Sequence, residues 1–211
     1  AGVKIMWINY PHMPTGAPPT RELFNKLVSW AKSKKILLAH DNPYSLVLNE
    51  TPPLSILLEE GAKDVAIEMN SMSKSHNMAG WRLGMVAGHK EQIKNILRVK
   101  SNIDSGMLLP VQLAAAEALK NDSAWYDEMN SVYIKRRKIA EEIMDVLGCS
   151  FNPDQTGLFL WGRIPDKMES SKALTDDLLQ NAHLFITPGL IFGKNGERYI
   201  RISLCSKEET L

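Results

Sequence analysis

Short apolar runs alternate with amphipathic segments along the first half of the chain. Leu23, Leu27 and Ala31 recur at helical spacing, and Thr20 stands where a helix N-cap is expected. Further helices are expected from about 89 to 100 and after Pro110. Short strands alternating with helices favour an α/β fold, with a mostly parallel sheet in a three-layer α/β/α arrangement. The predicted strands are residues 3–8, 36–40, 65–69 and 83–87.

The pattern changes in the second half of the chain. Residues 122–147 keep helical spacing throughout and predict one long helix of roughly 39 Å, long enough to connect two domains. Beyond it, residues 158–161 and 199–204 predict strands, with a helix between them at about 169–181. The predicted division is part of a large domain over 1–121, a connecting helix over 122–147, and a smaller, incomplete α+β domain over 148–211.

Composition and charge narrow the class of protein. The formal net charge is +1, which gives no reason to expect nucleic acid or an anionic membrane as a partner. No apolar run reaches the roughly 20 residues of a membrane span. The chain opens without a signal-peptide pattern, and Cys149 and Cys205 lie far apart, as in a reduced cytoplasmic protein. Because it opens in a buried-looking apolar run and stops in a helix start, we expect a fragment of a longer protein.

The segment from Ser71 to Arg82 carries the strongest chemical signal. It connects two apolar runs that we expect to be buried, and Gly80 and Gly84 allow close backbone approach. A lysine in a serine-rich loop, such as Lys74, is most often a solvated surface residue. Here, however, Ser71, Ser73 and Arg82 are the donor types that bind a phosphate dianion.

This segment closely resembles the lysine signature of class I/II aminotransferases, the fold-type-I enzymes that depend on pyridoxal 5'-phosphate (PLP). Within that family it is most similar to the aspartate/alanine/LL-diaminopimelate aminotransferase group. The resemblance implies that Lys74 holds the cofactor as a Schiff base and moves the substrate's α-proton. It also implies that Ser71, Ser73 and Arg82 bind the cofactor phosphate, and that residues 1–121 are part of the PLP-binding domain.

A second candidate site, Asp41 with Tyr44, follows the second predicted strand. An aspartate at a strand end before a proline is most often an ordinary turn residue. Asp41 and Lys74 both follow strands, however, and open α/β sheets bind ligands outside the carboxyl ends of their strands. The resemblance implies that Asp41 pairs with the cofactor's ring nitrogen and that Tyr44 binds its phenolic oxygen. A buried carboxylate keeps the ring nitrogen protonated, which makes the ring an electron sink.

The loop Asn9–Gly16 resembles the family's Asn-Pro-Thr-Gly loop with one departure. Met13 stands where the family has an asparagine that donates to the phenolic oxygen, and a thioether cannot donate a hydrogen bond. Several replacements remain open: Tyr44 alone carries the contact, or Asn9, His12 or a water molecule compensates.

Arg201 alternates with apolar residues in the last predicted strand. Such an arginine usually lies on the solvent-facing side of its strand. The resemblance implies instead that Arg201 binds the substrate's α-carboxylate, because a guanidinium matches both carboxylate oxygens and so orients the substrate. His76, His89 and His183 have no metal-ligand spacing, so we interpret them as structural or surface residues and expect no metal.

The resemblance implies transamination between an amino acid and a 2-oxo acid with PLP as cofactor, in a homodimer whose N-terminal region completes the cofactor site. Two alternatives remain open. One is a PLP-dependent lyase or synthase of the same fold, such as a C–S lyase, because one fold hosts several reactions. The other is a PLP-binding regulatory module or an inactive fragment. We expect little or no turnover from these 211 residues alone.

Overall fold

The computed structural model describes residues 2–211, which form two compact units. The first unit contains the residues up to Pro11 and Pro18–Tyr126, and the second contains His12–Ala17 and Asp127–Leu211. The boundary falls inside helix α6 (Ser123–Val146), which matches the long helix expected from the sequence. The predicted domain limits at 121 and 148 stay a prediction.

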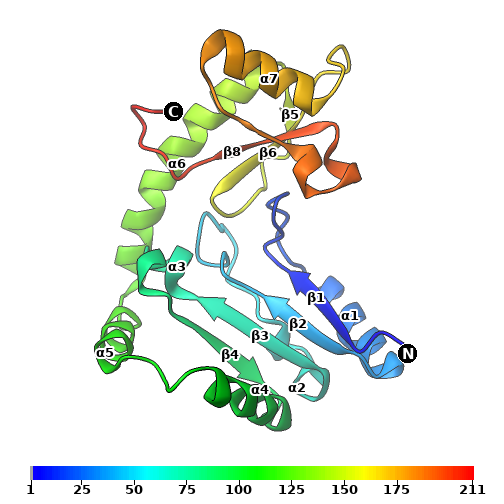
Figure 1. Ribbon diagram of the computed structural model, residues 1–211, viewed down its shortest axis with the longest axis vertical. Coiled ribbons are helices and arrows are strands. Elements are labelled where there is room, and N and C mark those ends of the chain that lie inside the picture. Colours follow the sequence, from blue (N-terminus) through cyan, green and yellow to red (C-terminus); the bar gives the residue numbers. More distant parts are fainter. Residues whose placement is uncertain (1) are drawn as a thin grey trace. The chain divides into compact units, whose positions relative to one another are not determined.

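A four-stranded sheet in the order β1-β2-β3-β4 forms the centre of the first unit (Figure 1). β1, β2 and β3 run parallel, whereas β4 is antiparallel to β3. The α/β fold class is confirmed, and the sheet is mixed because a connection without a crossover helix joins β3 to β4. The strands are β1 (Ile5–Asn9), β2 (Leu37–Asp41), β3 (Ala66–Ser71) and β4 (Gly84–Gly88).

Helix α1 (Arg21–Lys34) covers one face of this sheet (Figure 1). Thr20 caps it as predicted, because its hydroxyl accepts a hydrogen bond of 3.1 Å from the backbone N–H of Leu23. The apolar side of the helix packs on the strands and gives the unit its core. The buried core residues include Phe24, Val28 and Ala31 of α1 together with Ile8, Leu38 and Ala66 of the strands.

The outer strands are more exposed than their apolar sequences suggest. In β1 the side chains of Ile5 and Trp7 are 49% and 67% exposed, and Met85 in β4 is 62% exposed. The expectation that these runs are buried is therefore wrong at these positions. The physical reason is their place in the sheet, since β1 and β4 are its two edge strands.

Several helices complete the first unit. The two long ones, α4 and α5, confirm the helices expected near 89–100 and after Pro110. The short ones were not predicted, because a single turn shows no hydrophobic period. The most consequential of these is α3, which contains Lys74. The elements are η1 (Ile56–Leu58), α2 (Ala62–Val65), α3 (Met72–Ser75), η2 (Ala79–Trp81), α4 (Lys90–Ile103) and α5 (Leu109–Ala118).

The second unit contains a four-stranded sheet in the order β5-β6-β8-β7, in which all neighbours are antiparallel. The predicted strands near 158–161 and 199–204 are present, and so is the helix between them. The two-residue strands β5 and β7 are too short to have been predicted. The elements are β5 (Ser150–Phe151), β6 (Phe159–Arg163), α7 (Ser171–Ala182), β7 (Thr187–Pro188), η3 (Gly189–Phe192), η4 (Lys194–Gly196) and β8 (Tyr199–Ser203).

Candidate active site

The turn that carries Lys74 is anchored at its start by Ser71. Ser71 is the last residue of β3 and the N-cap of α3, and its hydroxyl accepts from the backbone N–H of Ser73 at 3.2 Å. The same hydroxyl donates to the backbone carbonyl of Leu83 at 3.3 Å. Ser71 also pairs with Gly84 of β4. The half-buried Lys74 therefore lies in a turn held between two neighbouring strands.

Arg82 lies at the other end of this connection, two residues before β4 begins at Gly84. Its backbone adopts a left-handed conformation with φ 53°, and its exposed guanidinium donates to the carbonyl of Ala79 at 2.9 Å. The residues predicted to bind a phosphate, Ser71, Ser73 and Arg82, thus lie in the same β3–β4 connection as Lys74. Hydroxyl and guanidinium groups are suitable donors for a phosphate dianion. In this structure the hydroxyl hydrogen of Ser71 is donated to Leu83, so a bound phosphate would take over that hydrogen bond.

Asp41 is the last residue of β2, next to β3 in the sheet. The side-chain amide of Asn9 donates to its backbone carbonyl at 2.8 Å. Asp41 is exposed in this structure, so the expectation of a buried carboxylate is wrong here, because Asp41 is the last residue of its strand. Partial desolvation still raises the pKa of the Asp41 carboxyl, and the charge of His40 acts against this increase. Tyr44 follows in the next turn and is buried, with 9% of its surface exposed.

The carboxyl ends of the parallel strands bring these candidates to one edge of the sheet. β1 ends at Asn9, β2 at Asp41 and β3 at Ser71, and Lys74 follows within the next turn. This edge is the usual ligand-binding edge of an open α/β sheet. The amine of Lys74 and the carboxylate of Asp41 therefore come from the same edge of the sheet, and their roles at a cofactor stay a prediction.

Arg201 lies in the second unit, on β8. Its neighbours Ile200 and Ile202 are buried, whereas Arg201 points to the half-buried side of the strand. The guanidinium carbon lies 4.0 Å from the ring centroid of Phe159 and 4.5 Å from that of Phe192. Arg201 is therefore held between two aromatic faces, which orients its planar group through cation–π contacts.

Two buried polar clusters of the first unit were not recognised from the sequence. In one, His40 and Glu68 face each other across β2 and β3; in the other, His76 contacts Tyr126. The signal available in the sequence was a polar residue inside an apolar run at positions 40 and 68. For His76, the interpretation as a structural residue agrees with its 7% exposure.

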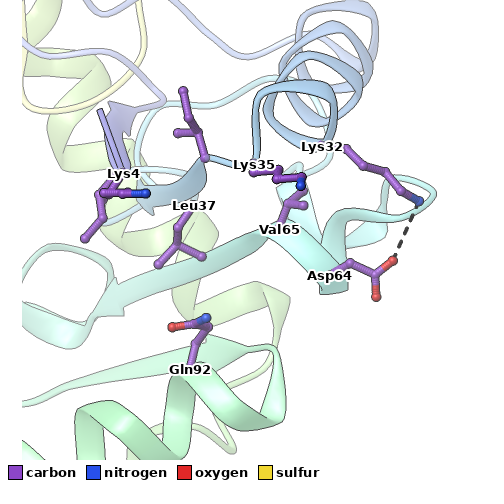
Figure 2. A pocket seen from close by; sticks show the side chains of 9 residues that line it. Lys4, Lys32, Lys35, Leu37, Asp64, Val65 and Gln92 are labelled. Atoms are coloured by element: carbon purple, nitrogen blue, oxygen red, sulfur yellow. Dashed lines mark ion pairs between the residues drawn. The ribbon is translucent and has the colours of Figure 1, made fainter. Parts of the chain in front are cut away.

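A hollow of about 480 Å³ lies at a different place in the first unit (Figure 2). Lys4, Lys32 and Lys35 contribute amines to it, and an ion pair of 3.8 Å joins Lys32 to Asp64. Lys4 directly precedes β1 and Leu37 begins β2, so the hollow lies at the amino ends of the strands. None of the predicted site residues lines it.

The part of the chain that the structure describes contains neither a candidate membrane span nor a candidate metal site. None of the helices in residues 2–211 combines the length and apolar character needed to cross a bilayer. The same residues contain no cluster of histidine, cysteine and acidic side chains suited to a metal ion. Cys149 is a buried free thiol whose pKa is raised to about 11 by burial, and Cys205 is exposed.

The first unit has an α/β sheet with a lysine turn at the carboxyl edge of its parallel strands, and comparison with known proteins gives the family. The sequence model of the family described as aminotransferase class I and II matches residues 1–211. The chain therefore belongs to the class I and II aminotransferase family, whose enzymes depend on PLP.

Similar proteins carry related names. LL-diaminopimelate aminotransferase of Aquifex aeolicus (strain VF5) is 43% identical over 210 residues, which is 99% of this chain and 54% of that protein. LL-diaminopimelate aminotransferase 2 of Trichormus variabilis is 39% identical over 209 residues, covering 99% of this chain and 53% of that protein. The chain thus spans about half of the length of these relatives.

Solved structures of similar proteins share the fold. Apo-BacF from Bacillus subtilis matches with a TM-score of 0.91 and 35% identity, covering 99% of this chain and 53% of that one. A probable N-succinyldiaminopimelate aminotransferase from Thermus thermophilus matches with a TM-score of 0.90 and 32% identity, covering 98% of this chain and 55% of that one.

Proposed function

We propose that the full-length protein is a PLP-dependent aminotransferase that exchanges the amino group of an amino acid with the carbonyl group of a 2-oxo acid. One observation carries this proposal. The Lys74 turn follows β3, and Asp41 ends the adjacent parallel strand β2, so the amine and the carboxylate occupy the same edge of the sheet. Family membership supports the reaction type.

The residues at this edge fit the cofactor's chemistry. When bound, PLP supplies an aldehyde that condenses with amines and a ring that accepts an electron pair from the substrate. Lys74 would attach to the aldehyde and, once freed, carry the proton of the substrate's α-carbon. Asp41 would hold a proton on the ring nitrogen, which favours electron acceptance. Ser71, Ser73 and Arg82 would bind the phosphate.

Two further contacts complete the proposal. Arg201 would bind the substrate's α-carboxylate with its fork of donors, and its position between Phe159 and Phe192 limits the orientations the guanidinium can take. Tyr44 would donate to the phenolic oxygen of the cofactor. Because Met13 cannot donate there, Tyr44 alone, Asn9, His12 or a water molecule remain the candidates for the missing contact.

LL-diaminopimelate is the first amino acid to test as substrate, because two similar proteins are named for it.

A homodimer in the cytoplasm belongs to the same proposal. The exposed apolar side chains of α4 and α5, among them Ile103 at 78% and Leu109 at 62%, support burial of this surface in a larger assembly. Sedimentation of the full-length protein tests the dimer. The free thiols Cys149 and Cys205 fit a reducing compartment.

The decisive experiment locates the covalent attachment. The full-length protein is incubated with PLP, reduced with borohydride and digested with a protease, and the peptide masses are measured by mass spectrometry. We expect the reduced cofactor on Lys74 and no labelled peptide in Lys74→Ala, whereas Lys63→Ala is labelled normally. Labelling at another lysine, or equal labelling of Lys74→Ala, would refute the assignment.

A product assay separates transamination from the lyase alternative. With an amino acid and 2-oxoglutarate, an aminotransferase releases glutamate, whereas a lyase releases ammonia and a carbonyl product without needing the 2-oxo acid. We expect glutamate to form only when both substrates are present. Ammonia in the absence of 2-oxoglutarate would favour the lyase, and cofactor attachment without turnover would favour the inactive binding module.

A further inference from the structure

Glu68 is the centre of a largely buried hydrogen-bond network next to the candidate site, since the side chain of His40 is fully buried and that of Glu68 is 12% exposed. Oε2 of Glu68 lies 3.0 Å from Nδ1 of His40 and accepts from the hydroxyl of Ser55 at 2.9 Å and the backbone N–H of Ile56 at 3.0 Å. Its Oε1 accepts from the side-chain amide of Asn42 at 3.2 Å. Burial acts to raise the pKa of Glu68, but the hydrogen bonds and the charge of His40 outweigh burial and lower it. Glu68 is therefore a carboxylate.

The two partners of His40 determine the protonation of its ring. Nε2 lies 3.0 Å from the backbone carbonyl of Tyr10, which can only accept, so Nε2 carries a hydrogen. Nδ1 faces the Glu68 carboxylate, which also accepts, so Nδ1 carries a hydrogen too. The ring is fully buried, with the Phe24 ring edge-on at 5.1 Å. The two acceptors together require a hydrogen on each ring nitrogen, and Glu68 and Asp41 are the carboxylates next to this ring.

This network holds both sequence neighbours of Asp41. Side chains alternate along a strand, so His40 points to the core face while Asp41 points to the other. Glu68 binds His40 on one side of Asp41 and Asn42 on the other. Asn9 binds the Asp41 carbonyl from the neighbouring strand. The backbone that aims the Asp41 carboxylate is thus held on three sides.

We infer that His40 and Glu68 form a buried ion pair that positions Asp41 for its contact with the ring nitrogen of the cofactor, so that His40 and Glu68 are positioning residues of the site. This inference rests on the proposed PLP-binding function. Stability alone does not account for the pair, because replacing a buried ion pair by apolar side chains is often neutral or stabilising. The pair has a functional role if it fixes the end of β2, because the next residue, Asp41, must contact the charged ring of the cofactor.

The protonation state is tested first, without cofactor. In the full-length apoprotein, nitrogen-15 NMR of the histidine rings at pH 7.5 should show both ring nitrogens of His40 bearing hydrogen, and Glu68→Gln should leave only one protonated. A neutral His40 ring in the unsubstituted protein would overturn the ion pair. This readout does not depend on whether PLP binds.

The positioning role is tested by PLP affinity. His40→Gln and Glu68→Gln should each weaken PLP binding about 10-fold or more, the scale of a lost charged hydrogen bond. Val28→Ala is the matched control, since it removes buried volume from the same core without touching the network. We expect Val28→Ala to lower the unfolding temperature and leave PLP affinity unchanged.

The pH dependence of PLP binding separates charge from general loosening. The imidazolium disfavours protonation of Asp41, so its loss should move the fall in PLP affinity at low pH to a higher pH in both network variants and not in Val28→Ala. If the unsubstituted protein binds PLP and the variants match it in affinity and pH profile, the positioning role is wrong. If the unsubstituted protein does not bind PLP, the proposed function itself fails. Should one variant not fold, the other and the NMR measurement still decide.

Discussion

The hydroxyl of Tyr126 lies 3.0 Å from Nε2 of His76, which links the start of α6 to the turn that carries Lys74. Nδ1 of His76 donates to the hydroxyl of Ser75 at 2.8 Å, because the Ser75 hydroxyl uses its own hydrogen on the carbonyl of Ser71 at 3.2 Å. His76 Nε2 is then the acceptor, and the Tyr126 hydroxyl is the donor. The hydrogen bonds form one directional chain that ends where the lysine turn begins.

Removing the Tyr126 hydroxyl should loosen this turn. Tyr126→Phe leaves the His76 acceptor without its donor, so we expect a loss of about 1–3 kcal/mol of stability. Hydrogen exchange should accelerate at the amides of His76 and Met78, which both donate to the Met72 carbonyl. Tyr199→Phe on β8 is the control and should leave these amides unchanged. Equal exchange in Tyr126→Phe and the unsubstituted protein would contradict the chain.

The same histidine predicts a pH dependence of stability. Desolvation lowers the pKa of His76 from its usual value of 6.5. The unfolded protein therefore binds a proton more readily, and the contribution of His76 is present above pH 6.5 and lost as the pH falls toward the folded-state pKa. Urea unfolding of the apoprotein at pH 8 and pH 5.5 should show a smaller decrease for His76→Gln than for the unsubstituted protein. The exposed His183→Gln should retain the full decrease.

Gly88 on β4 should not accept a side chain. Its φ is +146°, and a Cβ there would lie 2.7 Å from the Ala66 carbonyl oxygen and 2.9 Å from the Ile67 Cα. Backbone strain and crowding together predict that Gly88→Ala lowers the free energy of unfolding by about 2–4 kcal/mol. A Cβ on Gly80 would meet nothing within 4 Å, so Gly80→Ala should shift the urea midpoint little. Similar midpoints for both variants would show that β3 and β4 do not approach this closely.

Arg201 should not be replaceable by lysine. An ammonium keeps the charge but neither stacks between Phe159 and Phe192 nor offers the planar fork for a carboxylate. In the full-length protein we expect Arg201→Lys to raise the KM for the amino acid about 10-fold or more, from loss of one charge-assisted hydrogen bond. Arg163→Lys on the neighbouring β6, where Arg163 pairs with Asp166, is the matched control. An unchanged KM in Arg201→Lys would remove Arg201 from the substrate site.

Features that depend on neighbours in the sequence were predicted well. The apolar runs indicated β1, β2, β3 and β4, and the Thr20 cap followed from one residue type before a periodic segment. The direction of β4 could not be predicted, since an apolar run reads the same in parallel and antiparallel strands. The helical turn around Lys74 was missed because it is too short to show a period.

In the candidate site, too, the groups formed by residues close in the sequence were predicted, whereas those formed by distant residues were not. Ser71, Ser73, Lys74 and Arg82 are close in the sequence, so one segment was enough to group them. The pairing of His40 with Glu68 depends instead on the register of β2 against β3, in which these two residues are opposite each other. No local pattern contains that register. The rings that enclose Arg201 likewise come from separate elements, β6 and η3.

The antiparallel return of β4 has a consequence for how this segment can vary. Ser71 and Gly84 are paired in the sheet, so the connection between β3 and β4 starts and ends at the same residue pair. Extra residues inserted there would have to bulge outward as a loop, and a deletion would break the pair itself. We therefore expect residues 71–84 to keep the same length in homologous proteins, which differ there by substitutions and not by insertions or deletions.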